Sequence, residues 1–228
     1  MHTAFDSARA RFNMIEQQIR PWDVLDQDVL ALLNVVKRED FVAPSQRELA
    51  FTDVELPIQL SDKSSGEKMW CPRMEARVLQ DLGVKRHDKV LMIGVGSGYL
   101  AALFAHVADA VTAVEISPTM KALAEENLRR THTVNVLIKE GDGARGFGSD
   151  TYDVIVLTGA TPVLAPELKS QLKPGGRLFA VIGEAPAMRA TVVTRQPVDG
   201  GFAYTETVLF ETNLKPLANA PHAPRFTF

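Results

Sequence analysis

The stretch V-L-M-I-G-V-G-S-G-Y (90–99) places three glycines within five positions. An apolar run precedes them, and an apolar run with helical spacing follows. Glycine tolerates positive φ and lets the backbone approach a ligand closely. A turn of this kind at the carboxyl end of a strand in an open α/β sheet is a typical place for a nucleotide-like ligand.

The spacing of the glycines narrows the choice of ligand. A dinucleotide-binding turn has G-x-G-x-x-G, but this chain has Tyr99 where glycine or alanine is required. A nucleoside-triphosphate loop has lysine after its last glycine, and none follows Gly98. A ligand without a pyrophosphate remains, and S-adenosylmethionine (SAM) fits if its amino-acid end lies along the turn. The residues expected to contact it here are Gly94, Val95, Gly96, Ser97, Gly98 and Tyr99.

Two acids follow the next two expected strands. Glu115 ends one strand, where its carboxylate is placed to accept hydrogen bonds from both ribose hydroxyls, and each charged hydrogen bond contributes about 1.5–3 kcal/mol. Asp142 follows the other strand and is placed to accept from the adenine amino group. A glycine turn alone is weak evidence, and Glu115 alone is more often a solvated strand end. The three features in order predict SAM binding.

Strands alternating with helices are needed to position these residues. We expect strands at 89–93, 111–116, 134–139, 152–157 and 177–182, with helices between them. This alternation predicts right-handed βαβ units and a mostly parallel, Rossmann-like α/β sheet. Beyond it, 191–195 and 204–212 are separated by D-G-G and predict a terminal antiparallel hairpin.

The N-terminal third is expected to be helical and irregular. A first helix ends at Pro21, Asp26 caps a second, and S-D-K-S-S-G (61–66) is interpreted as a mobile loop. A further helix begins at Pro72 and ends at Gly83. Its apolar face is formed by Met74 or Glu75, Val78, Leu79 and Leu82. We therefore divide the chain into a helical and substrate-loop region (1–83), packed on the core, and a SAM-binding α/β core with its hairpin (84–228).

Composition excludes several classes of protein. Of 228 residues, 46% are hydrophobic and 23% charged, which is typical of a globular protein, and the net charge of −3 without a basic run argues against a nucleic-acid partner. No apolar stretch approaches the length of a membrane span. The histidines lie far apart and predict no metal site. The single cysteine, Cys71, cannot form an internal disulfide, so the cytoplasm is the expected location.

These motifs, with others before them, resemble one family over nearly the whole chain. N-M-I-E-Q-Q-I-R-P (13–21), R-E-D-F-V (38–42) and L-A-F-T-D-V-E-L-P-I (49–58) are similar to N-terminal segments of protein-L-isoaspartate O-methyltransferases. The resemblance implies a cytoplasmic repair enzyme that uses SAM to methylate isoaspartyl carboxylates in proteins or peptides. It also implies a ribose segment V-E-I and an adenine segment G-D-G, which add Ile116 and Gly143 to the cofactor site.

The chain departs from the family in two places. The family's substrate loop resembles G-Q-T-I-S-Q-P, whereas this chain has G-E-K-M-W-C-P (66–72), with Lys68 at the threonine position and Trp70 at the serine position. Trp70 is expected to wall the pocket, to donate through its indole, to fill the pocket, or only to pack in the core. Lys68 is expected to pair with an acidic acceptor or to remain a surface residue, and Ser64 or Ser65 is a candidate to replace the lost hydroxyl. The second departure is Met92, which replaces the family's usual acid two residues before Gly94.

Loss of the serine hydroxyl does not by itself abolish the chemistry. An isoaspartyl carboxyl has a pKa near about 4, so it is ionised at neutral pH and needs no general base. Methyl transfer then depends on in-line placement, which contributes up to about 7–11 kcal/mol, whereas one lost hydrogen bond costs about 1 kcal/mol. Three functions remain open: an isoaspartyl methyltransferase, a methyltransferase with another acceptor, and a SAM-binding homologue without catalytic activity.

Overall fold

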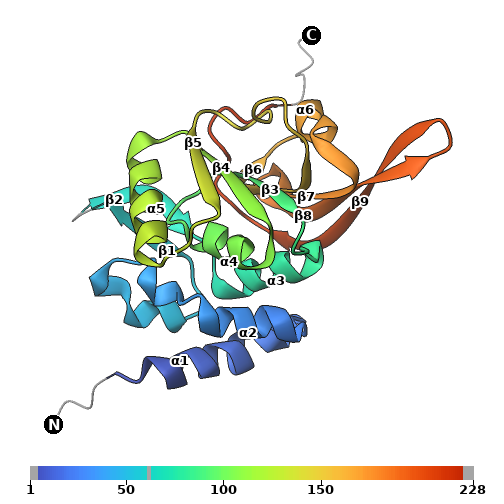
Figure 1. Cartoon of the computed structure of the whole chain (residues 1–228). Helices are drawn as coiled ribbons and strands as arrows, with labels where there is room; N and C mark the ends of the chain where they lie inside the picture. Colours follow the sequence, from blue (N-terminus) through green and yellow to red (C-terminus); the bar gives the residue numbers. More distant parts are fainter. Residues whose placement is uncertain (1–4, 61–62, 223–228) are drawn as a thin grey trace.

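The computed structural model describes residues 5–60 and 63–222. Its centre is a seven-stranded sheet with the order β5-β4-β3-β6-β7-β8-β9, and β1 and β2 form a separate hairpin (Figure 1). The strands are β1 (Leu56–Leu60), β2 (Lys63–Met69), β3 (Lys89–Ile93), β4 (Ala110–Glu115), β5 (Val136–Glu140), β6 (Tyr152–Thr161), β7 (Leu172–Glu184), β8 (Ala187–Val198) and β9 (Gly201–Thr212).

Helices flank both faces of this sheet and start at the caps that the sequence provides. Asp26 accepts from the N–H groups of Asp28 and Val29 at the start of α2, and Ser117 accepts from that of Met120 at the start of α5. The α-helices are α1 (Ser7–Met14), α2 (Gln27–Val35), α3 (Pro72–Leu82), α4 (Tyr99–Val107), α5 (Pro118–Arg130) and α6 (Pro166–Ser170).

The sheet is parallel except at one end. β3 pairs in parallel with both β4 and β6, β4 with β5, and β6 with β7, whereas β8 and β9 are antiparallel additions. The chain winds outward from β3 to β5 and then returns to the other side of β3. This reversal is the topological switch point at which open α/β sheets bind ligands. The predicted fold class, with its parallel sheet and terminal hairpin, is confirmed.

Strand β3 separates two apolar layers. Val90 and Met92 belong to the cluster formed with the N-terminal helices, α3 and α4, whereas Leu91 and Ile93 belong to the cluster on the opposite face. A strand buried on both faces is a continuous apolar run, as its sequence is. Met92 is completely buried in the first layer and does not line the pocket described below.

The N-terminal helices share a core with the sheet. Met14, Ile19 and Leu33 are almost fully buried in the same cluster as strand β3. The first helical run also continues past α1 through a π-turn at Ile15–Ile19 and a 3-10 turn at Arg20–Trp22. Pro21 therefore lies within the run, not at its end as predicted. The division at residue 83 stays a prediction.

The interpretation of 61–66 as a mobile loop is wrong for residues 63–66. These residues begin β2, which pairs antiparallel with β1, while 61–62 lie outside the described residues. The hydroxyl of Ser65 donates to the carbonyl of Ile58 at 2.7 Å, so a polar side chain bonds back to its partner strand. Composition suggested a loop because this strand has mostly exposed polar side chains.

Element lengths also differ from the predictions near the end of the sheet. β7 begins at Leu172, just after the C-cap of α6, so L-K-P-G-G (172–176) lies inside a strand with an irregular register. The helix expected between the strands at 152–157 and 177–182 is the short α6, and β5 begins at Val136, two residues later than predicted. The β8–β9 hairpin is longer than predicted and extends away from the body (Figure 1). Across residues 5–60 and 63–222, no helix combines the length and apolarity needed to cross a membrane.

Candidate functional site

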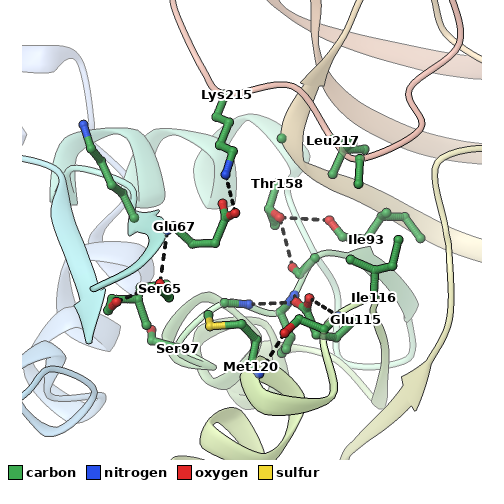
Figure 2. Close-up of a pocket in the computed structure, with 18 of the residues that line it drawn as sticks. Ser65, Glu67, Ile93, Ser97, Glu115, Ile116, Met120, Thr158, Lys215 and Leu217 are labelled. Atoms are coloured by element: carbon green, nitrogen blue, oxygen red, sulfur yellow. Dashed lines mark hydrogen bonds and ion pairs between the residues drawn. The ribbon is translucent and has the colours of Figure 1, made fainter. Parts of the chain in front are cut away.

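A pocket of about 700 Å³ lies at the carboxyl ends of β3 and β4, at the switch point of the sheet. Figure 2 shows Ser65 and Glu67 of the β1–β2 hairpin on one side, with Glu115, Ile116 and Leu217 on the other. Most of the predicted site residues line it: Lys68, Trp70, Gly94, Val95, Gly96, Ser97, Tyr99, Glu115, Ile116, Asp142 and Gly143.

The glycine turn requires its glycines. Gly94 has a φ of +86°, and a Cβ atom there would lie 2.2 Å from the hydroxyl oxygen of Thr158. Gly96 has a φ of +57° and lines the pocket. Gly98, also predicted to contact the cofactor, is not among the lining residues. It caps α4, and a Cβ atom there would lie 3.4 Å from Leu128 Cγ, so its visible role is helix packing.

Glu115 connects the end of β4 to the glycine turn. The side chain is almost buried, with its residue 7% exposed. Oε2 accepts from the N–H of Val95 at 3.0 Å and from that of Gly96 at 3.5 Å, while Oε1 accepts from that of Ser117 at 3.0 Å. An ionised carboxylate offers about four acceptor sites. These three bonds leave one acceptor site free on Oε1, and a ligand hydroxyl gains a second on Oε2 if it replaces the long bond from Gly96.

Asp142 is held at the far end of the pocket by two donors. Oδ1 accepts from the N–H of Ala144 and Oδ2 from the side-chain amide of Asn219, both at 2.9 Å. Asn219 comes from the C-terminal segment, so this segment orients the acid. Ile116 presents a partly exposed apolar side chain to the same pocket, with 46% exposure. An acid and an apolar surface therefore lie at the pocket, as an adenine ring requires.

Trp70 is a wall of the pocket and part of the core. Its residue is 7% exposed, and its ring packs edge-on against Phe179 with centroids 5.8 Å apart. The indole Nε1–H donates to the carbonyl of Thr158 at 3.0 Å. Trp70 therefore both walls the pocket and packs in the core, which were two of the alternatives expected from the sequence. The indole does not fill the pocket, and its donor already has a protein acceptor.

The other substrate-loop side chains also have partners. Lys68 Nζ lies 3.0 Å from Glu55 Oε2 at the rim, with 59% of the lysine side chain exposed. The Ser65 hydroxyl donates to Ile58, as described above, and accepts from the N–H of Glu67 at 3.1 Å. Ser64 does not line the pocket. A serine that replaces the missing hydroxyl would have to exchange one of these bonds.

Thr158 was not predicted as a site residue. Its hydroxyl lies 2.9 Å from the carbonyl of Ile93 and 3.0 Å from that of Gly94, so it joins β6 to the start of the turn. The register of β6 shifts between Val156 and Ala160, which places Thr158 at the irregularity. The Thr158 carbonyl accepts the hydrogen bond from the Trp70 indole N–H. Sequence periodicity gave no sign of this irregularity.

Glu75 was also not predicted as a site residue, but for a different reason. It was placed on the apolar face of a helix, and the structure puts it on the inner face of α3, 2% exposed and lining the pocket. Oε2 lies 3.3 Å from Arg38 Nε but makes no hydrogen bond. Burial raises the pKa of Glu75 to about 8, and Arg38 opposes that rise. An acid at helical spacing with Val78 and Leu82 was the available signal.

Comparison with solved structures defines the fold. A protein-L-isoaspartate O-methyltransferase superposes with a TM-score of 0.74 and 23% identity, over 92% of this chain and 66% of that one, so this chain spans about two thirds of its length. A Plasmodium falciparum protein described as a putative member of that group, in complex with S-adenosyl-L-homocysteine, gives 0.75 and 19% identity, over 90% and 97%. The fold is that of the α/β methyltransferases.

Sequence comparison gives the family. The family model described as Protein-L-isoaspartate(D-aspartate) O-methyltransferase matches residues 9–211. A Herpetosiphon aurantiacus protein-L-isoaspartate O-methyltransferase is 34% identical over 221 residues, covering 95% of each chain. One from Methanoculleus marisnigri is 38% identical over 176 residues, covering 77% of this chain and 78% of that one. The chain belongs to the protein-L-isoaspartate O-methyltransferase family.

Proposed function

We propose that this protein is a SAM-dependent methyltransferase that methylates the carboxylate of isoaspartyl residues in damaged proteins or peptides. The observation that carries the proposal is the convergence of the glycine turn, Glu115 and Asp142 on one pocket in a chain of this family. The relatives named above carry this activity in their names, and the Plasmodium falciparum structure holds S-adenosyl-L-homocysteine.

The pocket fits SAM along its length. Backbone groups of the turn at Gly94–Gly98 lie where an amino-acid end can approach, since no Cβ atom blocks Gly96. Glu115 retains acceptor capacity for the two ribose hydroxyls, and Asp142 is oriented for the adenine amino group, with Ile116 against the ring. When bound, SAM supplies an electrophilic methyl group.

The protein's task toward the acceptor is placement. The isoaspartyl carboxylate is an anion at neutral pH, with a pKa near about 4, so no residue has to remove a proton from it. Two lysines at the rim, Lys68 and Lys215, are candidates to attract it, and each is paired with an acid, Glu55 and Glu67 respectively. We propose that the acceptor carboxylate exchanges with one of these acids, while Trp70 limits the depth to which it enters.

Trp70 also favours a second candidate function, a SAM methyltransferase with a different acceptor. The indole donor is taken by Thr158, so position 70 offers no side-chain hydrogen bond to a carboxylate. A less polar acceptor would suit this wall better. The cytoplasm remains the expected location, and the lone Cys71 is a free thiol.

A paired assay tests the proposal. Transfer of radiolabelled methyl groups from SAM is measured on an isoaspartyl peptide and on its aspartyl twin, with SAM binding followed by calorimetry. Transfer to the isoaspartyl peptide alone supports the proposal. Binding without transfer to either peptide favours another acceptor or a non-catalytic homologue, and absence of SAM binding contradicts all methyltransferase functions. Isoaspartyl activity that appears only in Trp70→Ser would assign the loop departure to a changed acceptor.

A further inference from the structure

The segment after β9, residues 213–218, lines the same pocket as the glycine turn. Its backbone is fixed to β6, because the Ala160 N–H donates to the carbonyl of Lys215 at 3.0 Å and the Leu217 N–H donates to the carbonyl of Ala160 at 2.8 Å. Leu217 also packs closely on β6, since a Cβ atom added at Gly159 would lie 2.9 Å from Leu217 Cδ2. The segment therefore presents the side chain of Lys215 from a fixed backbone.

The side chain of Lys215 reaches from this segment to the β1–β2 hairpin, where it points toward Glu67 of β2 (Figure 2). Its Nζ forms an ion pair with Glu67 Oε1 and lies 3.4 Å from the carbonyl oxygen of Gly66. Both side chains of the pair are exposed, 64% for the lysine and 46% for the glutamate. Exposed ion pairs contribute little to stability, so another carboxylate can replace Glu67 at small cost.

Lys68, the other lysine at the rim, is placed differently. Its partner Glu55 directly precedes β1, so that pair joins the two sides of one hairpin. The pair of Lys215 and Glu67 joins two separate elements and spans the space between them. The indole donor of Trp70 is already bonded within the protein. An acceptor that enters between the hairpin and the C-terminal segment therefore meets Lys215 and Glu67 together.

We propose that Lys215 binds the acceptor carboxylate, and that Glu67 occupies the lysine as an internal competitor until the acceptor arrives. The inference rests on the proposed function and deepens it, because it names the cation that holds the acceptor. The acceptor carboxylate has a pKa near about 4, so it exchanges with Glu67 as one anion for another and no proton moves. The ammonium group of Lys215 offers three donors, and the displaced Glu67 carboxylate returns to solvent.

The two charges of the pair then have opposite effects on the acceptor. Loss of the Glu67 charge frees Lys215 and should strengthen acceptor binding. Loss of the Lys215 charge removes the acceptor's partner and should weaken binding. A pair that only braces the hairpin would give effects of the same sign, because loss of either side chain opens the same contact. The sign of the two effects therefore separates a role in acceptor binding from a structural role.

Steady-state methyl transfer to an isoaspartyl peptide measures both effects. Glu67→Gln should lower KM by about two- to fivefold, as expected for release of an exposed ion pair, with kcat changed little. Lys215→Gln should raise KM by about tenfold or more, and Lys215→Arg should restore KM to within about threefold of the wild type. In the variant with both glutamines, the benefit of Glu67→Gln should disappear. Glu206→Gln, which breaks the exposed Lys169–Glu206 pair outside the pocket, is the matched control and should leave KM unchanged.

Calorimetry of the same variants with S-adenosyl-L-homocysteine, and of the loaded proteins with the peptide, separates cofactor binding from acceptor binding. Opposite changes in KM for Glu67→Gln and Lys215→Gln, with S-adenosyl-L-homocysteine binding unchanged, support the proposal. A rise in both variants, or no change in either, overturns it while isoaspartyl transfer by the wild type still supports the proposed function. Weaker S-adenosyl-L-homocysteine binding by Lys215→Gln with an unchanged peptide KM also overturns it, because the lysine would then serve the cofactor. Failure of the wild type both to methylate and to bind the peptide contradicts the proposed function itself.

Discussion

Two glutamates, Glu115 and Glu75, line the same pocket but have different surroundings. Glu115 stands at a strand end and accepts backbone N–H groups from Val95, Gly96 and Ser117. Glu75 stands on the inner face of α3, where its Oε2 lies 3.3 Å from Arg38 Nε and accepts no hydrogen bond from the described residues. Backbone donors hold the carboxylate of Glu115 in place before a ligand arrives. Glu75 has no backbone donor among the described residues; burial raises its pKa to about 8, and Arg38 opposes that rise.

The comparison distinguishes two kinds of buried acid at the pocket. Glu115 is part of a preorganised site, since the same bonds that hold its carboxylate also hold the turn. Glu75 is a buried acid beside Arg38, and its burial disfavours the charged form of the carboxyl group. The four variants that follow test this difference, in order of the expected size of the effect.

Glu115→Ala should give the largest effect. It removes the acceptor for two ribose hydroxyls and releases the N–H groups of Val95 and Gly96, and each charged hydrogen bond contributes about 1.5–3 kcal/mol. The Kd for SAM, measured by calorimetry, should rise by about a hundredfold or more. A Kd within about threefold of the wild type would show that Glu115 only shapes the end of its strand.

Gly94→Ala tests whether the turn beside Glu115 is rigid. The new Cβ atom would lie 2.2 Å from the Thr158 hydroxyl oxygen at a φ of +86°, so we expect a loss of about 3 kcal/mol in the free energy of unfolding in urea. Gly148→Ala is the matched control, with a φ of +66° and no atom within 4 Å of the added Cβ. It should lose only about 1 kcal/mol. Equal losses in both variants would mean that the turn relaxes.

Glu75→Gln should change how stability depends on pH in the ligand-free protein. The folded pKa of about 8 lies above the usual value of 4.5, so the folded state binds more protons than the unfolded state between these values. Wild-type stability is therefore highest below the unfolded pKa and falls as pH rises toward 8, by up to about 1.4 kcal/mol per pH unit. Urea titrations from pH 5 to 8.5 should show this slope in the wild type and a flatter one in the variant. Parallel slopes would place an ordinary, ionised acid at position 75.

Lys68→Ala should have the smallest effect on the fold. Its ion pair with Glu55 is exposed, and such pairs contribute about 0.2–1 kcal/mol. We expect an unfolding free energy within about 0.5 kcal/mol of the wild type. If Lys68 attracts the acceptor carboxylate, KM for an isoaspartyl peptide should rise while kcat changes little. An unchanged KM would leave Lys68 as a surface residue.

The difference between the two glutamates also explains what the sequence predicted. Glu115, Asp142 and the glycine turn follow apolar strands at short range, so local pattern places them at one edge of a parallel sheet. Thr158 joins the site through an irregular register in β6, which no local pattern records. Glu75 depends on how α3 packs against the sheet, a tertiary contact.

The same limit applies to the β1–β2 hairpin. Its second strand has mostly exposed polar side chains, including Ser64 and Ser65, and composition alone suggested a loop. The hairpin forms because β2 pairs with β1 and because Ser65 bonds to Ile58 across the strands. The C-terminal segment that supplies Asn219 to Asp142 was also not predicted, since its contact joins residues 77 positions apart.

The most direct measurement is a calorimetric titration of the wild type and of Glu115→Ala with S-adenosyl-L-homocysteine and with 5′-methylthioadenosine, which keeps the adenosine but lacks the amino-acid end. Glu115→Ala should weaken the binding of both ligands by about a hundredfold or more, because both contain the ribose whose hydroxyls Glu115 is proposed to accept. If Glu115→Ala leaves the binding of 5′-methylthioadenosine unchanged, the assignment of Glu115 to the ribose is wrong.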